Sequence, residues 1–219
     1  MVSPTGEGAG SVAVFPGWRL VRALGIALLL VAGLAACAGR GVWAPDDAVQ
    51  AARYAHPGAP ELALITVTHN RTGRGDHTAL LISAGERVLF DPAGSWYHRL
   101  APERHDVHHG LAPQLFAIYI NYHTRETHHT VVQRMAVSPE VAQRALRLAQ
   151  EKGPVNNAFC ARATAEILRE LPGFEGISVS WFPHELKAQF AQLDGVETHT
   201  LRHDDPDLTA RIAAAQRPL

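Results

Sequence analysis

Runs of apolar and β-branched residues predict a set of strands that follow one another closely. Leu62–Thr68 is continuous in this character, which is typical of a buried strand. Residues 77–82 and 87–91 predict two more strands, joined by a turn at Ser83-Ala84-Gly85. Because strands joined by short turns pair antiparallel, we expect these three to form part of an antiparallel sheet.

The second half of the sequence favours helices. Ser138-Pro139 is a good helix start because proline suits the first helical position. Asn156 and Asn157 are candidate caps for a helix that Pro172-Gly173 ends. Residues 92–113 form a long loop that suits a lid over a site. The remaining expectations are helices at 46–54, 138–152, 158–171 and 180–195, strands at 130–137 and 196–201, and either state for 114–122.

The N-terminal segment has the pattern of an export signal. Arg19 and Arg22 precede an apolar run from Ala23 to Ala36, and small residues close it. This run has about 14 residues, whereas a membrane-spanning helix needs roughly 20. We therefore expect a signal that is removed, and the alternatives are an ordinary signal peptide or a buried helix.

The end of this run predicts a lipid anchor. Leu34-Ala35-Ala36-Cys37 resembles the bacterial lipobox, whose cysteine is diacylated and becomes the new N-terminus. The predicted organisation is a signal peptide at 1–36, a tether at 37–45 and one domain at 46–219. Two or more acyl chains hold a protein at a membrane without a span. By resemblance to lipoprotein sorting, Ala38 after the cysteine favours the outer membrane, facing the periplasm.

Charge and length narrow the classes of function. The chain has 20 Lys and Arg against 21 Asp and Glu, and no basic block indicates nucleic-acid binding. The length remaining after the predicted cleavage suits one domain with a sizeable core. The order of the predicted elements indicates an α+β fold, in which an antiparallel sheet packs against helices.

Cys160 is the most informative single residue. The sequence has two cysteines, and the lipid would take Cys37. Cys160 would then have no disulfide partner in an oxidising compartment, so it is either buried and inert or kept for its reactivity. If Asn157 is the cap, Cys160 lies in the first helical turn. Unpaired N–H groups and the helix dipole favour a thiolate there.

A nucleophilic thiol needs a base, and the base needs an acceptor that orients it. His77 begins one predicted strand and Asp91 ends the next. A three-residue turn with Gly85 left-handed would pair Ile82 with Glu86 and place His77 directly opposite Asp91 on one face. A two-residue turn would place them on opposite faces. The alternatives are an exposed histidine at a strand edge and an aspartate that forms a turn before proline.

These residues resemble a known family. His77-Thr-Ala-Leu-Leu-Ile, then Asp91, then Asn157-Ala-Phe-Cys160 on a later helix are similar to the circularly permuted papain-like group. That group is related to NlpC-type murein peptidases and to lecithin retinol acyltransferase-like enzymes. The resemblance implies Cys160 as nucleophile, His77 as base and Asp91 as third member. A tyrosine contacts the oxyanion in some relatives, which makes Tyr119 and Tyr122 candidates.

The residue before the cysteine departs from the pattern of that group. Acyltransferase relatives have Asn there and murein peptidases commonly have Asp, whereas this chain has Phe159. The expected activity is therefore a thiol hydrolase or acyl transferase that acts on an amide or an ester, with murein peptides and envelope acyl groups as candidates. The expected chemistry needs no cofactor.

Two other classes of function stay open, namely a non-catalytic envelope lipoprotein that binds a partner and a metal-binding protein. The second would use a cluster of histidines in and after the long loop. Neither the H-E-x-x-H motif nor the Cys/His spacing of a structural zinc site is present in the sequence, so we expect no metal and interpret these side chains as solvated. The cluster comprises His105, His108, His109, His123, His128 and His129. We interpret four aromatic residues as packing residues rather than as a binding platform, namely Trp96, Tyr97, Trp181 and Phe182.

Overall fold

The computed structural model describes residue 18, residues 21–28 and residues 41–217. The chain divides into two units between residues 38 and 39. In the first unit residues 21–28 are helical, within the predicted signal segment. The predicted lipidation site, Cys37, lies outside the described residues. Within the described residues, no helix has both the length and the apolar character that crossing a bilayer requires.

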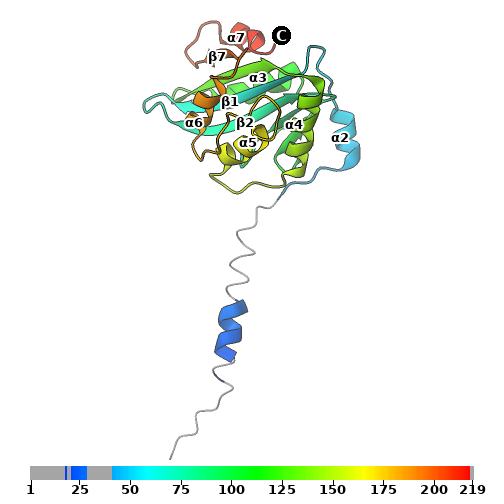
Figure 1. The fold of residues 1–219 in the computed structure, drawn as a ribbon, viewed down its shortest axis with the longest axis vertical. Coiled ribbons are helices and arrows are strands. Elements are labelled where there is room, and N and C mark those ends of the chain that lie inside the picture. The colour runs from blue at the N-terminus through cyan, green and yellow to red at the C-terminus, as the bar shows by residue number, and fades with distance from the viewer. Residues whose placement is uncertain (1–17, 19–20, 29–40, 218–219) are drawn as a thin grey trace, which may run out of the picture. The chain divides into compact units, whose positions relative to one another are not determined.

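The second unit is an α+β domain built on one antiparallel sheet (Figure 1). Its seven strands lie in the order β4-β5-β3-β2-β1-β6-β7, and each pairs antiparallel with its neighbours. The two long strands β1 and β2 lie next to each other in the middle of this order, and they are flanked by β6 on one side and β3 on the other. The strands are β1 (Glu61–His69), β2 (Gly75–Ser83), β3 (Arg87–Phe90), β4 (Glu103–Arg104), β5 (Val107–His109), β6 (His128–Ala136) and β7 (Glu197–Leu201).

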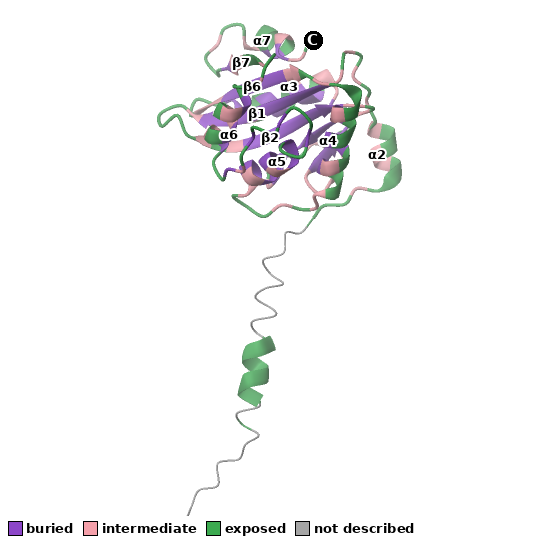
Figure 2. Cartoon of the chain, viewed as in Figure 1, coloured by how far each residue is buried: buried purple, intermediate pink, exposed green. Residues whose placement is uncertain are grey.

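Helices cover both faces of the sheet. One face carries α4, α5 and α6, which contact β1 and β2, and the other carries α3 and α7, which contact β6 and β7. The cartoon coloured by burial shows the strands buried and the outer sides of the helices exposed (Figure 2). The helices of this unit are α2 (Asp46–Ala52), α3 (Pro113–His123), α4 (Pro139–Glu151), α5 (Cys160–Leu168), α6 (Pro183–Phe190) and α7 (Leu208–Ala214).

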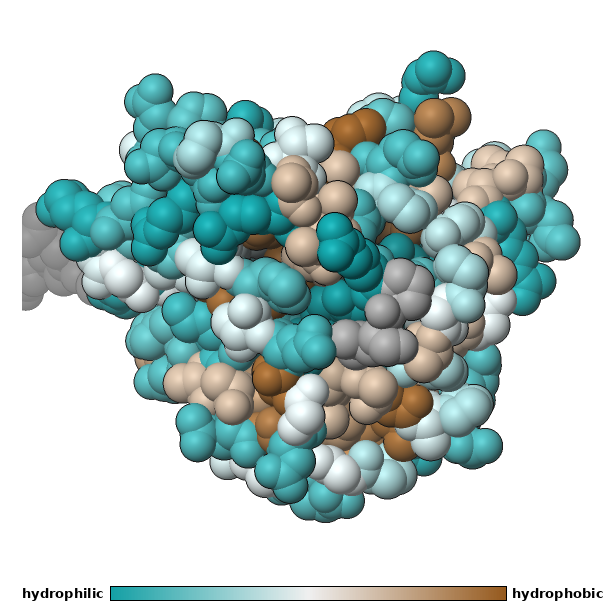
Figure 3. Space-filling model, turned by 90° about the horizontal axis from the view of Figure 1, so that it is seen from above, coloured by the Kyte–Doolittle hydropathy of each residue, from teal (hydrophilic) through white to brown (hydrophobic). Residues whose placement is uncertain are grey.

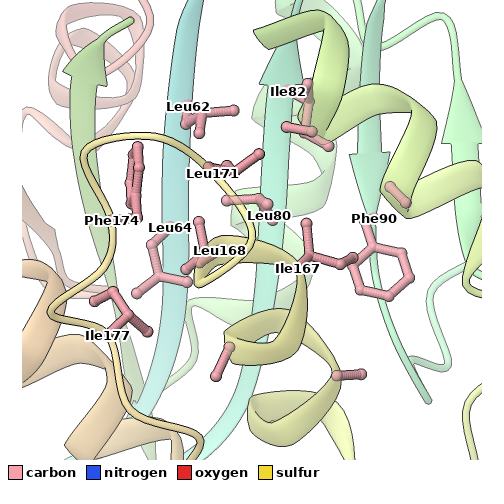
Figure 4. Packing of buried hydrophobic residues seen from close by; sticks show 14 of the residues in the cluster. Leu62, Leu64, Leu80, Ile82, Phe90, Ile167, Leu168, Leu171, Phe174 and Ile177 are labelled. Atoms are coloured by element: carbon pink, nitrogen blue, oxygen red, sulfur yellow. The ribbon is translucent and has the colours of Figure 1, made fainter. Parts of the chain in front are cut away.

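Alternate residues of the central strands enter two separate cores. Leu62, Leu64 and Leu80 point towards α5 and the segment that follows it, where they meet Leu168 and Phe174 (Figure 4). Their sequence neighbours point to the opposite face, where a second core includes residues of α3. Burial on both faces explains why these strands are continuously apolar rather than alternating. Viewed from above, the surface is mainly hydrophilic, with apolar side chains in small separate groups (Figure 3).

The predicted turn between β2 and β3 is wrong in its details. Ser83 pairs with Arg87, and Ala84 donates its N–H to the carbonyl of Glu86, so the turn lies one residue later than predicted. Gly85 is not among the residues with positive φ. The register therefore shifts by two residues, and the pairing of Leu80 with Phe90 leaves Asp91 level with Ala79 rather than with His77. An even shift keeps side chains on their original faces.

Two other boundaries differ from the prediction. Asn157 does not cap α5, because Ala158 has φ of 70° and the helix begins at Cys160, with Phe159 in the cap position. The left-handed conformation of Ala158 interrupts the backbone between Asn157 and the start of the helix, so α5 cannot begin before this residue. The long loop contains the short strands β4 and β5, which extend the sheet instead of forming a separate cover. Residues 114–122, which were ambiguous, are helical within α3.

Candidate active site

Cys160 is the first residue of α5, one position after the cap residue. The first hydrogen bond of this helix runs from the N–H of Ala163 to the carbonyl of Phe159, which leaves the N–H groups of the first turn free of helical partners. The backbone N–H groups of Ala161 and Thr78 are directed to the sulfur. The residue is only 6% exposed, yet its polar surroundings distinguish it from an inert core thiol.

The space for this sulfur arises because β3 is shorter than β2. Strand β3 pairs with β2 only as far as Leu80, whereas β2 extends back to Gly75. The backbone of Thr78 therefore lies beyond the end of β3, where its N–H can face the start of α5. Strand β1 continues to support this part of β2 on the other side, through the pairs Thr66–Thr78 and Val67–His77.

His77 lies between the thiol and a carboxylate. Its Nε2 is 2.6 Å from Oδ1 of Asp91, and on its other side the thiol of Cys160 lies close enough to raise the pKa of the imidazole. Since Asp91 uses Nε2, Nδ1 is the ring nitrogen left for the sulfur. The structure thus brings together all three residues that the sequence singled out. The register error does not separate His77 from Asp91, because diagonal neighbours on one face of a sheet stay within reach of each other.

The segment after β3 encloses Asp91. The backbone N–H of Asp91 donates to the carbonyl of Asp106 over 2.8 Å, and the carbonyl of Asp91 accepts the N–H of Gly94 over 3.0 Å. A Cβ atom on Gly94 would lie 2.0 Å from Oδ2 of Asp91. Only glycine therefore allows the loop to close over this carboxylate, which is 1% exposed.

The three groups shift one another's ionisation in the direction that favours charge separation. Burial opposes charge on His77, but the carboxylate of Asp91 and the thiolate of Cys160 outweigh it and raise the pKa of His77 to about 10. Burial likewise opposes the thiolate, but His77 and the nearby N–H groups hold the pKa of Cys160 below its usual value. Despite burial, His77 keeps the pKa of Asp91 low. These directions describe a thiolate–imidazolium pair.

Helix α3 supplies two residues that the sequence did not assign to these positions. The hydroxyl of Tyr119 donates to Oδ1 of Asp91 over 2.7 Å, so it is not available as the expected oxyanion contact. Tyr122 instead lies 3.3 Å from Oγ of Ser95 through its hydroxyl. His123 stacks on the ring of His77, with centroids 5.6 Å apart, and burial lowers its pKa to about 4. A neutral ring therefore covers the charged one.

His108 completes the surroundings of the carboxylate from the other side. Its Nε2 lies 3.9 Å from Oδ2 of Asp91, and its ring packs against Trp96 with centroids 5.0 Å apart. Burial is the largest cause of its lowered pKa.

The spacing of four between Tyr119 and His123 is the sequence signal for their shared position, because residues four apart lie on one face of a helix.

The other histidines of the predicted cluster have separate partners. His105 packs against Trp43, His109 pairs with Glu86, His128 with Asp76 and His129 with Asn70. Within the described residues, no group of three or more His, Cys, Asp or Glu side chains is arranged to hold a metal ion.

The four aromatic residues singled out in the sequence differ in their exposure. Trp96 is buried, whereas Tyr97, Trp181 and Phe182 are exposed.

Comparisons with protein-family models, with curated proteins and with solved structures found no match to this chain. The resemblance to the permuted papain-like group therefore stays a prediction from the residues of the sequence.

Proposed function

We propose that the protein is a thiol hydrolase or acyl transferase in which Cys160 is the nucleophile, His77 the acid–base and Asp91 the residue that orients the imidazole. The observation that carries this proposal is the position of His77, between a thiol on one side and a carboxylate at 2.6 Å on the other. A nucleophile, a base and an orienting acceptor in this order define the triad arrangement on any fold.

In the proposed reaction the thiolate of Cys160 attacks a carbonyl carbon and forms a tetrahedral intermediate. The charge that develops on oxygen is stabilised by free N–H groups at the start of α5 and by the helix dipole. His77 then gives its Nδ1 proton to the leaving nitrogen or oxygen as the bond to carbon breaks, which leaves a thioester on Cys160. Water or another acceptor loses a proton to His77, attacks the thioester and restores the thiolate.

The high pKa of His77 suits the first half of this cycle. At neutral pH the imidazolium is ready to protonate a leaving group, and the lowered pKa of Cys160 favours the thiolate. Asp91 stabilises the imidazolium and holds its ring orientation without taking the proton, because its own pKa is low. Tyr119 acts on this pair only through Asp91, so we assign it a positioning role.

The proposal extends to family and location. A histidine strand that precedes the cysteine helix is the order expected of the circularly permuted papain-like group. We propose that the chain is exported, cut before Cys37 and held by lipid at a bacterial envelope membrane, with the domain facing the periplasm. In that location an amide or an ester of the envelope is the substrate class, and murein peptides are the first candidates.

The test is incubation of purified murein with the wild-type protein and with Cys160→Ala, followed by chromatography of the released peptides. A parallel sample with p-nitrophenyl acetate is analysed by intact mass and peptide mapping. We expect acyl-enzyme on Cys160 in the wild type and much less in His77→Gln. Equal labelling of Cys160 in both proteins, with no Cys160-dependent product from murein, would contradict the enzyme assignment and favour a binding role.

A further inference from the structure

An aromatic pair, half-buried Phe159 and exposed Trp181, adjoins the nucleophile. Phe159 precedes Cys160 in the chain, and its ring centroid is 4.7 Å from that of Trp181. Trp181 is 50% exposed although it belongs to a well-packed domain. An exposed aromatic residue beside a reacting group is more informative than one elsewhere, because a bound substrate would cover it.

The segment that carries Trp181 is fixed in place rather than loosely attached. Oγ of Ser180 accepts the N–H of Phe182 over 3.0 Å and donates to the carboxylate of Glu185 over 2.5 Å. These bonds set the direction of the chain on both sides of Trp181. A side chain held outward by a bonded turn is preorganised for contact, so little conformational entropy is lost on binding.

This segment also packs against the strand of the base. A Cβ atom on Gly75 would lie 2.7 Å from both the Cβ of Pro183 and the N of His184. Gly75 begins β2 only two residues before His77. The aromatic pair is thus joined to the nucleophile through Phe159 and to the strand of the base through the start of α6.

Charged side chains lie next to the aromatic pair. The guanidinium of Arg162 lies 5.1 Å from the ring centroid of Trp181, and its Nε donates to Glu166 over 2.8 Å. Glu166 also pairs with Lys152, so the two cations share one carboxylate. A groove of about 280 Å³ is lined by Phe159 and by these three charged residues, Lys152, Arg162 and Glu166. Two cations facing one carboxylate leave a net positive charge beside the pair, so a positive charge on a bound group would be unfavourable.

We propose that Phe159 and Trp181 form the wall of an acyl-donor subsite that binds a large, uncharged apolar group next to the scissile carbonyl, with a flat aromatic group as the best fit. This inference depends on the proposed function, because it places the group relative to attack by Cys160. Phe159 adjoins the nucleophile in the chain, and consecutive Cα atoms are about 3.8 Å apart. A group on the wall therefore lies close to the carbonyl that Cys160 attacks, and we assign it to the acyl part of the substrate.

The kinetic test compares p-nitrophenyl acetate with p-nitrophenyl 3-phenylpropanoate, which share a leaving group and differ in the acyl part. We expect kcat/KM to favour the aromatic ester in the wild type. Trp181→Ala should reduce this preference by roughly threefold to tenfold, the effect of one lost aromatic contact, and Trp181→Phe should keep most of it. The matched control is Trp43→Ala, which removes a tryptophan that is 61% exposed and packs against His105 and Arg104.

A second arm does not need catalysis. Tryptophan fluorescence of Cys160→Ala is titrated with 3-phenylpropanamide, and the titration is repeated in Cys160→Ala carrying Trp181→Phe. We expect a saturable change in the first protein that is absent from the second. An equal response in both, or an unchanged ester preference in Trp181→Ala, would overturn the subsite. If ester hydrolysis persists at the wild-type rate in Cys160→Ala, the proposed function fails, and the fluorescence arm then decides whether the wall binds the ligand.

Discussion

Tyr119 donates its hydroxyl proton to Oδ1 of Asp91 over 2.7 Å, at the oxygen that also contacts His77. Both the tyrosine and the aspartate are buried, so neither has water as a substitute partner. One oxygen of a buried carboxylate therefore joins helix α3 to the imidazole on β2. This relationship makes the orientation of the base depend on a helix that carries neither the base nor the nucleophile.

Tyr119→Phe should lower the free energy of unfolding by about 1–3 kcal/mol, because it leaves a buried carboxylate with one donor fewer. Tyr119 helps to hold the pKa of Asp91 low, so Asp91 stabilises the fold above the usual aspartate range and this stability is lost on acidification. In the variant that pKa is less depressed, so less stability is lost on acidification and the loss is complete at a higher pH. Urea unfolding between about pH 2 and 7 measures both effects.

The matched control for Tyr119→Phe is Tyr122→Phe, which removes a hydroxyl from the exposed face of the same helix. Its unfolding free energy should stay within about 0.5 kcal/mol of the wild type, as is usual for surface changes. Equal effects of the two substitutions would show that the bond to Asp91 contributes nothing specific.

Asp91→Asn should reduce kcat roughly 10³- to 10⁴-fold, the scale of the same change in other catalytic triads. The amide cannot stabilise the imidazolium, so the pKa of His77 falls and less thiolate forms at neutral pH. Steady-state hydrolysis of p-nitrophenyl acetate measures this loss. Asp76→Asn removes a carboxylate next to His77 in sequence that pairs with His128 instead, and it should change kcat by less than about threefold.

Gly94→Ala should disturb the site through contact alone. The new methyl group would lie 2.0 Å from Oδ2 of Asp91, so the carboxylate must move away from the imidazole. We expect a roughly 10- to 100-fold loss of kcat/KM, as displacements of about 1 Å produce in other enzymes. Gly85→Ala, where the nearest atom to the added Cβ would be 3.5 Å away, should leave activity unchanged. Similar rates in the two variants would exclude close packing at Gly94 as a requirement.

Cys37→Ser should abolish incorporation of labelled palmitate in a bacterial host and release the domain from the membrane fraction. Cys160→Ser should retain both the label and the membrane association, because it lies outside the lipobox. Fractionation and autoradiography of the two variants separate the roles of the two cysteines. Labelling that persists in Cys37→Ser would contradict the anchor, without any consequence for the active-site assignment.

Local patterns in the sequence were sufficient to predict most of the sheet and its class. The continuous apolar run of β1 and the short turn before β3 indicated antiparallel neighbours, and Ser138 caps α4 as expected. Helix α7 was not predicted, and α3 was ambiguous because its apolar residues are buried against the sheet without a clear helical period. For such elements, tertiary packing decides what local preference leaves open.

The triad could be proposed from sequence because each member lies at the end of an element. Its supporting residues could not, because they depend on which face of the sheet each helix covers. Tyr119 reaches Asp91 only because α3 packs on the face towards which Asp91 points. Likewise, the exposure of Trp181 follows from the turn at Ser180, which hydrophobicity alone does not reveal.

The central claim is that Cys160 is held as a thiolate by His77, and the pH dependence of its alkylation tests this most directly. The rate of iodoacetamide modification at Cys160, followed by peptide mass, should fall less than about threefold between pH 8 and pH 6 in the wild type. Above about pH 10 His77 loses its proton but Cys160 stays a thiolate, so the rate should not fall there. In His77→Gln the rate should fall by roughly tenfold per pH unit, as for an ordinary thiol. A wild-type rate with that same slope would contradict the account.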